Sequence, residues 1–265
     1  MNDPAHLLVD DLDIWIGAIL RKTGSGRGNG GKLALYGIDK LRSLIIDLAV
    51  RGKLVPQDPV DGDAGELLKR AKQAINKAVA QKQRRAPKAT KFEPPKTALP
   101  HGWVWARMID IAQINPRNDA EDAQEASFIP MPLVSDRVNG AHESETRRWG
   151  DIRSGYTHFA DGDIALAKIT PCFENGKAAV FAGLRNGIGA GTTELHVARP
   201  VLDDFDRRFL LLTLKTPRYL ADGEAGRTGT AGQKRVPRSY FELTPSELTV
   251  RLQDKEMEAH ILSPA

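Results

Sequence analysis

The residues best suited to contact a ligand lie in a glycine-rich, basic stretch, Gly226-Arg-Thr-Gly-Thr-Ala-Gly-Gln-Lys-Arg-Val236. Glycines let the backbone approach a ligand closely, and threonine hydroxyls can donate to phosphate oxygens. Glutamine can pair with adenine, and arginine or lysine with guanine or phosphate. From Arg227 to Arg238 there are four basic residues and no acidic one. The pattern favours contact with a polyanion over the alternative, a mobile surface loop. The candidate contacts are Arg227, Thr228, Thr230, Gln233, Lys234, Arg235 and Arg238.

A second candidate is the stretch Lys168-Ile-Thr-Pro-Cys-Phe-Glu-Asn-Gly-Lys177. Its Asn175-Gly176 pair is typical of a tight turn between two strands. Lys168 and Lys177 flank this turn, and both could reach phosphates. The alternative is a hairpin whose two lysines are only solvated.

The remaining reactive side chains do not form a catalytic or metal-binding pattern. Cys172 has no base beside it and no second cysteine at zinc-ligand spacing, so a hydrolase or a zinc site is not expected. His196 falls in a strand-like alternation in which Leu195 and Val197 share one face while His196 shares the other with Glu194. This placement favours a strand histidine over a ligand.

An enzyme that methylates or cleaves DNA needs sequence motifs that this chain lacks. Asn115-Pro116 has only the first two residues of the Asn/Asp-Pro-Pro-aromatic motif of DNA methylation. Asp163 precedes Lys168 without the second carboxylate that a Mg²⁺-dependent nuclease needs. There is also no phosphate-binding lysine loop. We therefore expect a chain that is not an enzyme by itself.

The N-terminal elements expected to support these candidates are helical. Residues 1–22 predict a first helix, and Gly24–Gly31 predicts a flexible linker. Leu41–Arg51 predicts an amphipathic helix that Gly52 ends. A long helix is expected from Asp63, with Asp63 and Glu66 at capping-box spacing and an apolar face at Leu68, Ala71, Ile75 and Ala78.

The end of this long helix leads into a basic, proline-bearing linker. Residues 69–91 contain many lysines and arginines and no acidic residue. Such a run either contacts DNA or forms a solvated helix face, and the sequence leaves both open.

From about residue 99 the chain becomes β-rich. The fold class is therefore α+β, a helical N-terminal segment followed by a β-rich mixed domain. The expected division is 1–98, 99–250 and a divergent tail, 251–265. The predicted elements are strands at Val104–Ile114, Phe128–Val134, Asp163–Ile169, Lys177–Phe181 and Thr193–Val197, and helices near Asp206–Lys215 and after Pro237.

Composition limits the class of protein further. The chain has 265 residues and a net charge of +4, a mild indication of a polyanionic partner. It has no apolar run long enough to span a membrane and no signal-peptide pattern at its start. Its single cysteine suits the reducing cytoplasm, where we expect the protein to be.

Several strings resemble, in the same order, the specificity subunits of type I DNA restriction–modification systems. They are the helix and turn Leu41–Pro59, the Leu-Pro-His-Gly-Trp-Val-Trp string Leu99–Trp105, the loop Lys168–Lys177, the strand Gly191–Pro200 and the loop Gly226–Val236. The resemblance covers about Leu41–Glu242. It implies that 99–250 is a target recognition domain that reads double-stranded DNA, with the helices contacting partner subunits.

The resemblance also implies a division of labour. A modification subunit would bring S-adenosylmethionine, and a restriction subunit would bring ATP and Mg²⁺, so no cofactor is expected in this chain. Two features depart from the family pattern, a single recognition domain and a polar end, Ser246–Ala265. Three explanations stay open: a half-subunit that forms a homodimer, a truncated product, or a partial gene. The alternative function is a protein-interaction adaptor that does not read DNA.

Overall fold

A computed structural model describes residues 36–54, 62–87, 90–229 and 234–249, together with two short paired strands, β1 (Arg21–Lys22) and β2 (Leu33–Ala34). The predicted linker Gly24–Gly31 and the tail 251–265 lie outside the described residues. So does nearly all of the helix predicted over 1–22, whose last two residues form β1 instead.

Helix α3 (Tyr36–Val50) confirms the predicted amphipathic helix and its end. Gly52 has a φ of +62°, and its N–H donates to the carbonyl of Ala49 while the N–H of Lys53 donates to the carbonyl of Leu48. This pair of bonds is the Schellman arrangement that a C-terminal glycine permits. The face buried in the core carries Ile46, Ala49 and Val50. The spacing of the sequence instead predicts an apolar stripe at Leu41, Leu44, Ile45 and Leu48, of which Leu44 is exposed.

Gly52 also lies where two segments that are distant in the sequence pack against each other. A Cβ atom at this position would lie 2.8 Å from Pro100 Cγ and 2.8 Å from Trp103 Cζ2, so the helix end packs directly on the start of the β-rich part. The turn therefore needs glycine both for its backbone angle and for its lack of a side chain.

Replacing Gly52 with alanine is expected to lower the free energy of unfolding by about 2 kcal/mol. About half of this comes from the left-handed backbone angle and the rest from overpacking against Trp103. Gly155→Ala is the matched control, because Gly155 has a φ of +80° but a Cβ atom there would meet nothing within 4 Å. Urea unfolding should show a loss for Gly52→Ala about twice that for Gly155→Ala, and equal losses would contradict the packing role.

Helix α4 (Ala64–Ala80) begins where the sequence predicts, with the Asp63 carboxylate accepting a hydrogen bond from the N–H of Gly65. The predicted capping box does not form, because Glu66 pairs with Lys69 one turn along. The buried positions are Ala64, Leu67, Ala71 and Ile75, so only two of the four expected apolar positions are buried.

The β-rich part confirms the α+β class and contains two four-stranded sheets. One has the order β6-β5-β10-β7, with β6 (Glu145–Arg148), β5 (Glu125–Ile129), β10 (Ile188–Gly191) and β7 (Thr157–Ala160). The other has the order β4-β11-β8-β9, with β4 (Ala112–Ile114), β11 (Leu195–Pro200), β8 (Ile164–Ala167) and β9 (Ala178–Val180). All pairings are antiparallel except β10 with β5.

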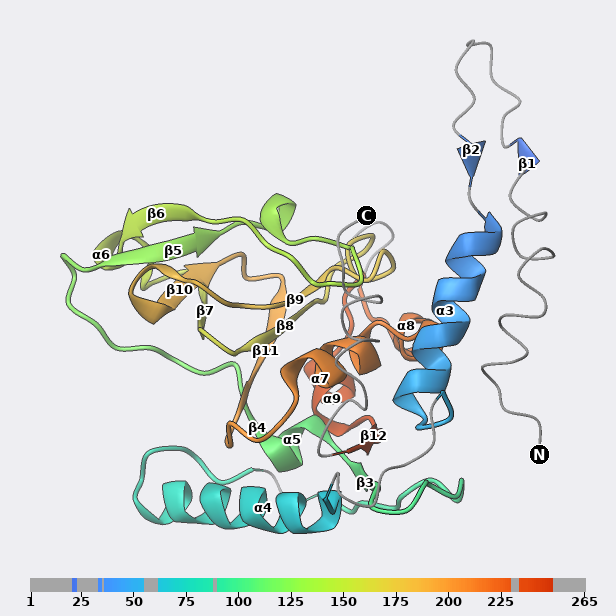
Figure 1. Cartoon of the computed structure of the whole chain (residues 1–265). Coiled ribbons are helices and arrows are strands. Elements are labelled where there is room, and N and C mark those ends of the chain that lie inside the picture. The colour runs from blue at the N-terminus through green and yellow to red at the C-terminus, as the bar shows by residue number, and fades with distance from the viewer. Residues whose placement is uncertain are drawn as a thin grey trace.

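Short helices and one further strand pair complete the described structure (Figure 1). The strand predicted over Val104–Ile114 is interrupted, because α5 (Met108–Ile111) separates β3 (Val104–Ala106), which pairs with β12 (Ser246–Leu248), from β4. The helix predicted near Asp206–Lys215 is confirmed as α7 (Arg207–Leu214), which Asp206 caps. The others are α6 (Trp149–Ile152), α8 (Pro217–Ala225), α9 (Arg238–Leu243) and the 3₁₀ turns Met131–Leu133 and Arg185–Gly187.

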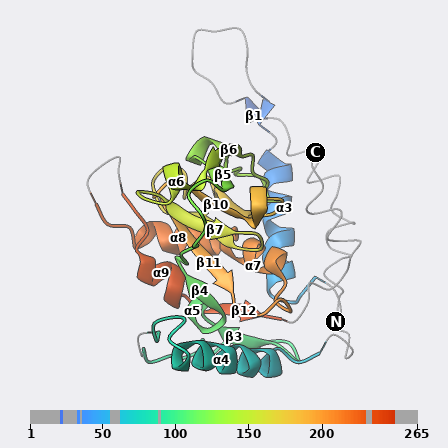
Figure 2. The ribbon, with the colours of Figure 1, turned by 90° about the vertical axis from the view of Figure 1, so that its left-hand side faces the viewer.

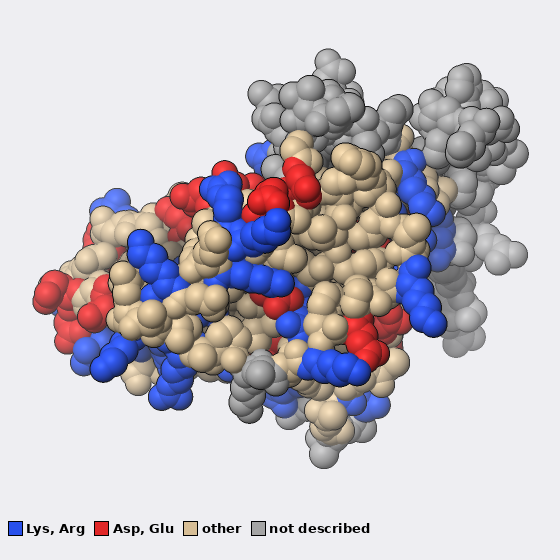
Figure 3. All heavy atoms as spheres, turned by 90° about the horizontal axis from the view of Figure 1, so that it is seen from below, with Lys and Arg blue, Asp and Glu red and all other residues tan. Residues whose placement is uncertain are grey.

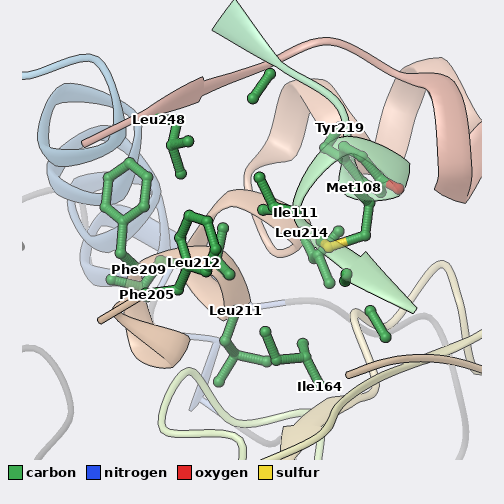
Figure 4. Packing of buried hydrophobic residues seen from close by; sticks show 14 of the residues in the cluster. Met108, Ile111, Ile164, Phe205, Phe209, Leu211, Leu212, Leu214, Tyr219 and Leu248 are labelled. Atoms are coloured by element: carbon green, nitrogen blue, oxygen red, sulfur yellow. The ribbon is translucent and has the colours of Figure 1, made fainter. Parts of the chain in front are cut away.

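The largest core cluster lies around α7 (Figure 4). Phe209 packs edge-to-face on Trp103 with ring centroids 5.6 Å apart, and Leu212 is fully buried. Ile46 of α3 and Leu67 of α4 belong to the same cluster. Both N-terminal helices therefore pack on the part that carries the candidate loops. The division at residues 98 and 250 stays a prediction.

Candidate nucleic-acid interface

The two candidate loops lie side by side. The stretch Lys168–Lys177 connects the antiparallel strands β8 and β9, but as a ten-residue loop and not as the tight turn that Asn175-Gly176 predicts. The N–H of Val236 donates to the carbonyl of Lys168 at 2.8 Å, and the N–H of Thr170 donates to the carbonyl of Lys234 at 3.0 Å. Backbone hydrogen bonds thus join segments that lie about sixty residues apart in the sequence.

A third segment, the start of β11, closes the cluster. The carbonyl of Glu194 accepts from the N–H of Lys168 at 2.9 Å, and His196 Nε2 lies 3.0 Å from the carbonyl of Val236. Three strings that resemble the family therefore meet in one place. We call this group, residues 168–177, 194–196, 226–229 and 234–238, the loop cluster. Figure 2 shows the two arms of the 226–238 segment extending from the body beyond α8 and α9.

The arms of the 226–238 segment are themselves paired. Thr228 and Arg235 exchange two backbone hydrogen bonds of 3.1 and 2.9 Å, and Arg235 also forms a bridge with Ile169 on its other side. The backbone of Arg235 is therefore fixed between two neighbours. Thr230 and Gln233, two of the predicted contacts, lie outside the described residues.

Arg235 forms a two-pronged ion pair with Glu194. Its Nε lies 2.9 Å from Oε2 and its Nη2 lies 2.7 Å from Oε1, while 43% of the Arg235 side chain stays exposed. The hydrogen bonds from Arg235 lower the pKa of Glu194 in spite of its partial burial, so the carboxylate is charged at neutral pH.

Three further predicted cations belong to the loop cluster. Lys234 is exposed and Lys168 is half-buried. Arg238 begins α9, donates to Glu242 at 2.6 Å and keeps 57% of its side chain exposed. Thr228 is exposed as well. Together with Arg235 these residues place positive charge and a hydroxyl group where a polyanion could reach them.

Two predicted contacts have internal partners instead. The Arg227 side chain is only 9% exposed and forms ion pairs with Glu174 and Glu224, and it donates to Thr170 Oγ1 at 2.8 Å. Lys177 donates to the carbonyls of Met131 at 3.2 Å and Val134 at 2.8 Å. In this conformation both side chains hold neighbouring loops together, and neither is directed to a ligand.

His196 has the surroundings of a core residue. It is buried, lies stacked on Phe241 with ring centroids 5.4 Å apart, and its pKa falls to about 4, chiefly because burial disfavours the charged imidazole. Cys172 is half-buried against the second core cluster. Within the described residues, no group of three or more histidine, cysteine or acidic side chains could hold a metal ion. None of the described helices is long and apolar enough to cross a membrane.

The basic run after residue 69 forms a separate surface. Lys69 and Arg70 pair with Glu66 and Asp204, whereas Lys72 and Lys77 are exposed along α4. Figure 3 shows the molecule from the side on which α4 lies, with basic side chains spread over this face and acidic ones between them. Its contact with DNA stays an open alternative.

Sequence reasoning missed the role of Glu194. The alternation of the strand placed Glu194 opposite the core-facing Leu195, but the residue that pairs with it lies 41 positions away. The only available signal was an acidic residue inside a string that otherwise resembles a DNA-binding family.

No family model matches the chain. The chain is 55% identical over 244 residues to the type I restriction enzyme EcoAI specificity subunit of Escherichia coli, which covers 90% of this chain and 41% of that protein. It is 54% identical, with the same coverage, to the EcoEI specificity subunit of the same organism. The chain thus spans less than half the length of these relatives.

Solved structures give a weaker likeness. One, from work on complex assembly and conformational transition of the type I R-M system, has a TM-score of 0.42 with 14% identity over 95% of this chain and 60% of that chain. The HsdS subunit from Thermoanaerobacter tengcongensis has a TM-score of 0.39 with 14% identity over 94% of this chain and 58% of that chain. This likeness in fold is too weak to bear on the site. Over 90% of its length, the chain is similar in sequence to part of the type I restriction enzyme specificity subunits EcoAI and EcoEI, of which it spans 41%.

Proposed function

We propose that this chain selects the DNA sequence on which a type I restriction–modification complex acts. The observation that supports the proposal is the loop cluster, where backbone hydrogen bonds join three distant segments and so bring Lys168, Lys234 and Arg235 together, with Arg238 three residues further along the chain. Such a fixed set of cations at the rim of a rigid scaffold suits recognition of a phosphate backbone and the bases beside it.

The proposed mechanism divides the work among these side chains. Lys168, Lys234 and Arg238 neutralise phosphates, which supplies affinity and sets the register on the duplex. Arg235 contacts a base edge in the major groove, because arginine is suited to guanine through two hydrogen bonds. Arg227 and Lys177 serve the loops that hold this arrangement.

The partners are proposed from the family. A modification subunit would supply S-adenosylmethionine and methylate the DNA, and a restriction subunit would supply ATP and Mg²⁺ for cleavage. This chain would carry out no chemistry, and the complex would act in the cytoplasm on double-stranded DNA.

Co-expression with the modification subunit, followed by methylation sequencing of the host DNA, tests the proposal. A methylated motif that appears only with this chain is the expected result, and a palindromic motif would indicate a homodimer. A chain that copurifies with its partner but gives no new methylation would overturn sequence selection and favour an adaptor.

Replacing Arg235 with alanine is expected to weaken binding to the cognate duplex about 30-fold, because it removes a two-pronged base contact. Fluorescence anisotropy with labelled duplex measures the change, and copurification with the modification subunit should be unaffected. Arg185→Ala is the matched control, because Arg185 also pairs with a glutamate, Glu125, but on the other sheet. Equal affinities for Arg235→Ala and the original chain would remove Arg235 from the site.

A further inference from the structure

The ion pair between Glu194 and Arg235 is held from both sides. The N–H of Glu194 donates to Thr192 Oγ1 at 3.1 Å, and its carbonyl accepts from Lys168. Arg235 is fixed by backbone bonds to Thr228 and by the bridge to Ile169. Neither backbone needs to move for the two side chains to meet, so the geometry of the pair is largely set before any ligand binds.

The geometry of the pair fixes the plane of the guanidinium group. Nε and Nη2 both donate to the Glu194 carboxylate, at distances from 2.7 to 3.1 Å. Two parallel bonds between planar groups leave little freedom of rotation, unlike a single charge contact. The Glu194 side chain is 22% exposed, whereas that of Arg235 is 43% exposed, so the glutamate is the more enclosed partner of the pair.

Other arginines of the loop cluster differ from Arg235. Arg238 donates to Glu242 from its Nε, and Arg227 is 9% exposed. Among the described arginines of the cluster, Arg235 alone combines a two-pronged partner, a fixed backbone and substantial exposure.

A carboxylate at this place has an electrostatic cost for DNA binding. Glu194 is charged at neutral pH and would repel nearby phosphates. A residue that served affinity alone would be neutral or basic. The carboxylate is better explained by what it does to Arg235, which it holds in one orientation.

We infer that Glu194 is a positioning residue that determines DNA specificity by fixing the guanidinium plane of Arg235 for a base edge. This inference rests on the proposed function and deepens it. Glu194 itself contacts no base, and its effect appears in discrimination between sequences more than in total affinity.

Two substitutions separate geometry from charge. Glu194→Gln removes the charge but nearly keeps the shape, whereas Glu194→Asp keeps the charge but withdraws the carboxylate by one methylene group. Each variant is co-expressed with the modification subunit, and the affinity of the complex is measured for the cognate duplex and for a scrambled duplex. Glu125→Gln, which breaks the Arg185 pair on the other sheet, is the control for loss of one negative charge.

Both Glu194 variants are expected to lower the ratio of cognate to scrambled affinity about tenfold. Only Glu194→Gln should bind the scrambled duplex more tightly, because it loses a negative charge. Glu125→Gln should leave the ratio unchanged. Thermal unfolding of each complex identifies a Glu194 variant that does not fold. In that case Arg235→Lys, which keeps the positive charge but loses the two-pronged guanidinium group, must show the same loss of discrimination.

The possible outcomes separate a failure of the positioning role of Glu194 from a failure of the proposed selection of DNA sequence. If Glu194→Asp discriminates like the original chain and Glu194→Gln gains equally on both duplexes, Glu194 is only a counter-charge and the inference is wrong. If the original complex does not discriminate between the duplexes, the proposed function fails, and the inference fails with it.

Discussion

Replacing Lys168, Lys234 and Arg238 together with glutamine is expected to lower DNA affinity by on the order of 100- to 1000-fold at 0.1 M salt. Each cation that neutralises a phosphate releases a counterion, which adds about 0.9 to the slope of log affinity against log salt. The triple variant should therefore lose about 2.7 from this slope, and the loss should be similar for cognate and scrambled duplexes. Anisotropy titrations at several salt concentrations measure both quantities.

The matched control changes the same net charge elsewhere. Lys72, Lys77 and Lys82, all exposed on α4 or just after it, are replaced with glutamine in a second triple variant. If the loop cluster carries the phosphate contacts, this variant keeps nearly the whole salt slope. An equal loss in the two triple variants would place the basic run of α4 on the DNA as well, and an unchanged slope in the first would remove the loop cluster from the interface.

Local signals in the sequence were sufficient for several elements. Gly52 and Asp63 define a helix end and a helix start through bonds to residues no more than four positions away. Asn175-Gly176 similarly predicts a bend, which lies within the ten-residue connection of β8 and β9, where Gly176 has a φ of +67°. These features depend on neighbours along the chain, so composition and spacing carry the information.

Which face of a helix is buried was less predictable. The apolar stripe of α3 suggests a core at Leu41, Leu44, Ile45 and Leu48, yet the core of the described structure receives Ile46, Ala49 and Val50. The sequence shows that α3 is apolar on more than one side, but it does not show which side meets α7. That choice depends on tertiary packing.

The candidate site was predictable as a set of strings, but its internal pairings were not. Arg227 and Arg235 have the same chemistry in the sequence, yet Arg227 is enclosed by Glu174 and Glu224 while Arg235 lies at the rim. Lys177 likewise meets backbone carbonyls of a segment more than forty residues away. Charge identifies a candidate contact, whereas exposure depends on which distant segment folds against it.

Acidification is expected to destabilise this protein through His196, a buried residue of the loop cluster that contacts the carbonyl of Val236. The buried imidazole has a pKa of about 4, whereas an unfolded histidine has a pKa near 6.5. Above pH 6.5 both states are neutral and the shift has no effect. Between these two values the unfolded chain binds a proton that the folded chain does not, so stability falls as the pH falls. The loss reaches about 2 kcal/mol at pH 5 and about 3 kcal/mol at pH 4.

Substitution of His196 with glutamine isolates this contribution, because glutamine does not titrate and keeps a donor for the Val236 carbonyl. Urea unfolding at pH 7.5, 6 and 5 gives the free energy of unfolding of both proteins. His142 and His158, whose pKa values burial also lowers, are present in both and cancel in the difference. The variant should be the less stable protein at pH 7.5, because it loses the stacking on Phe241, and the difference should shrink by about 2 kcal/mol by pH 5. Parallel pH dependences would mean that His196 has the same pKa in the folded and the unfolded protein. The lowered pKa of the buried imidazole would then be contradicted.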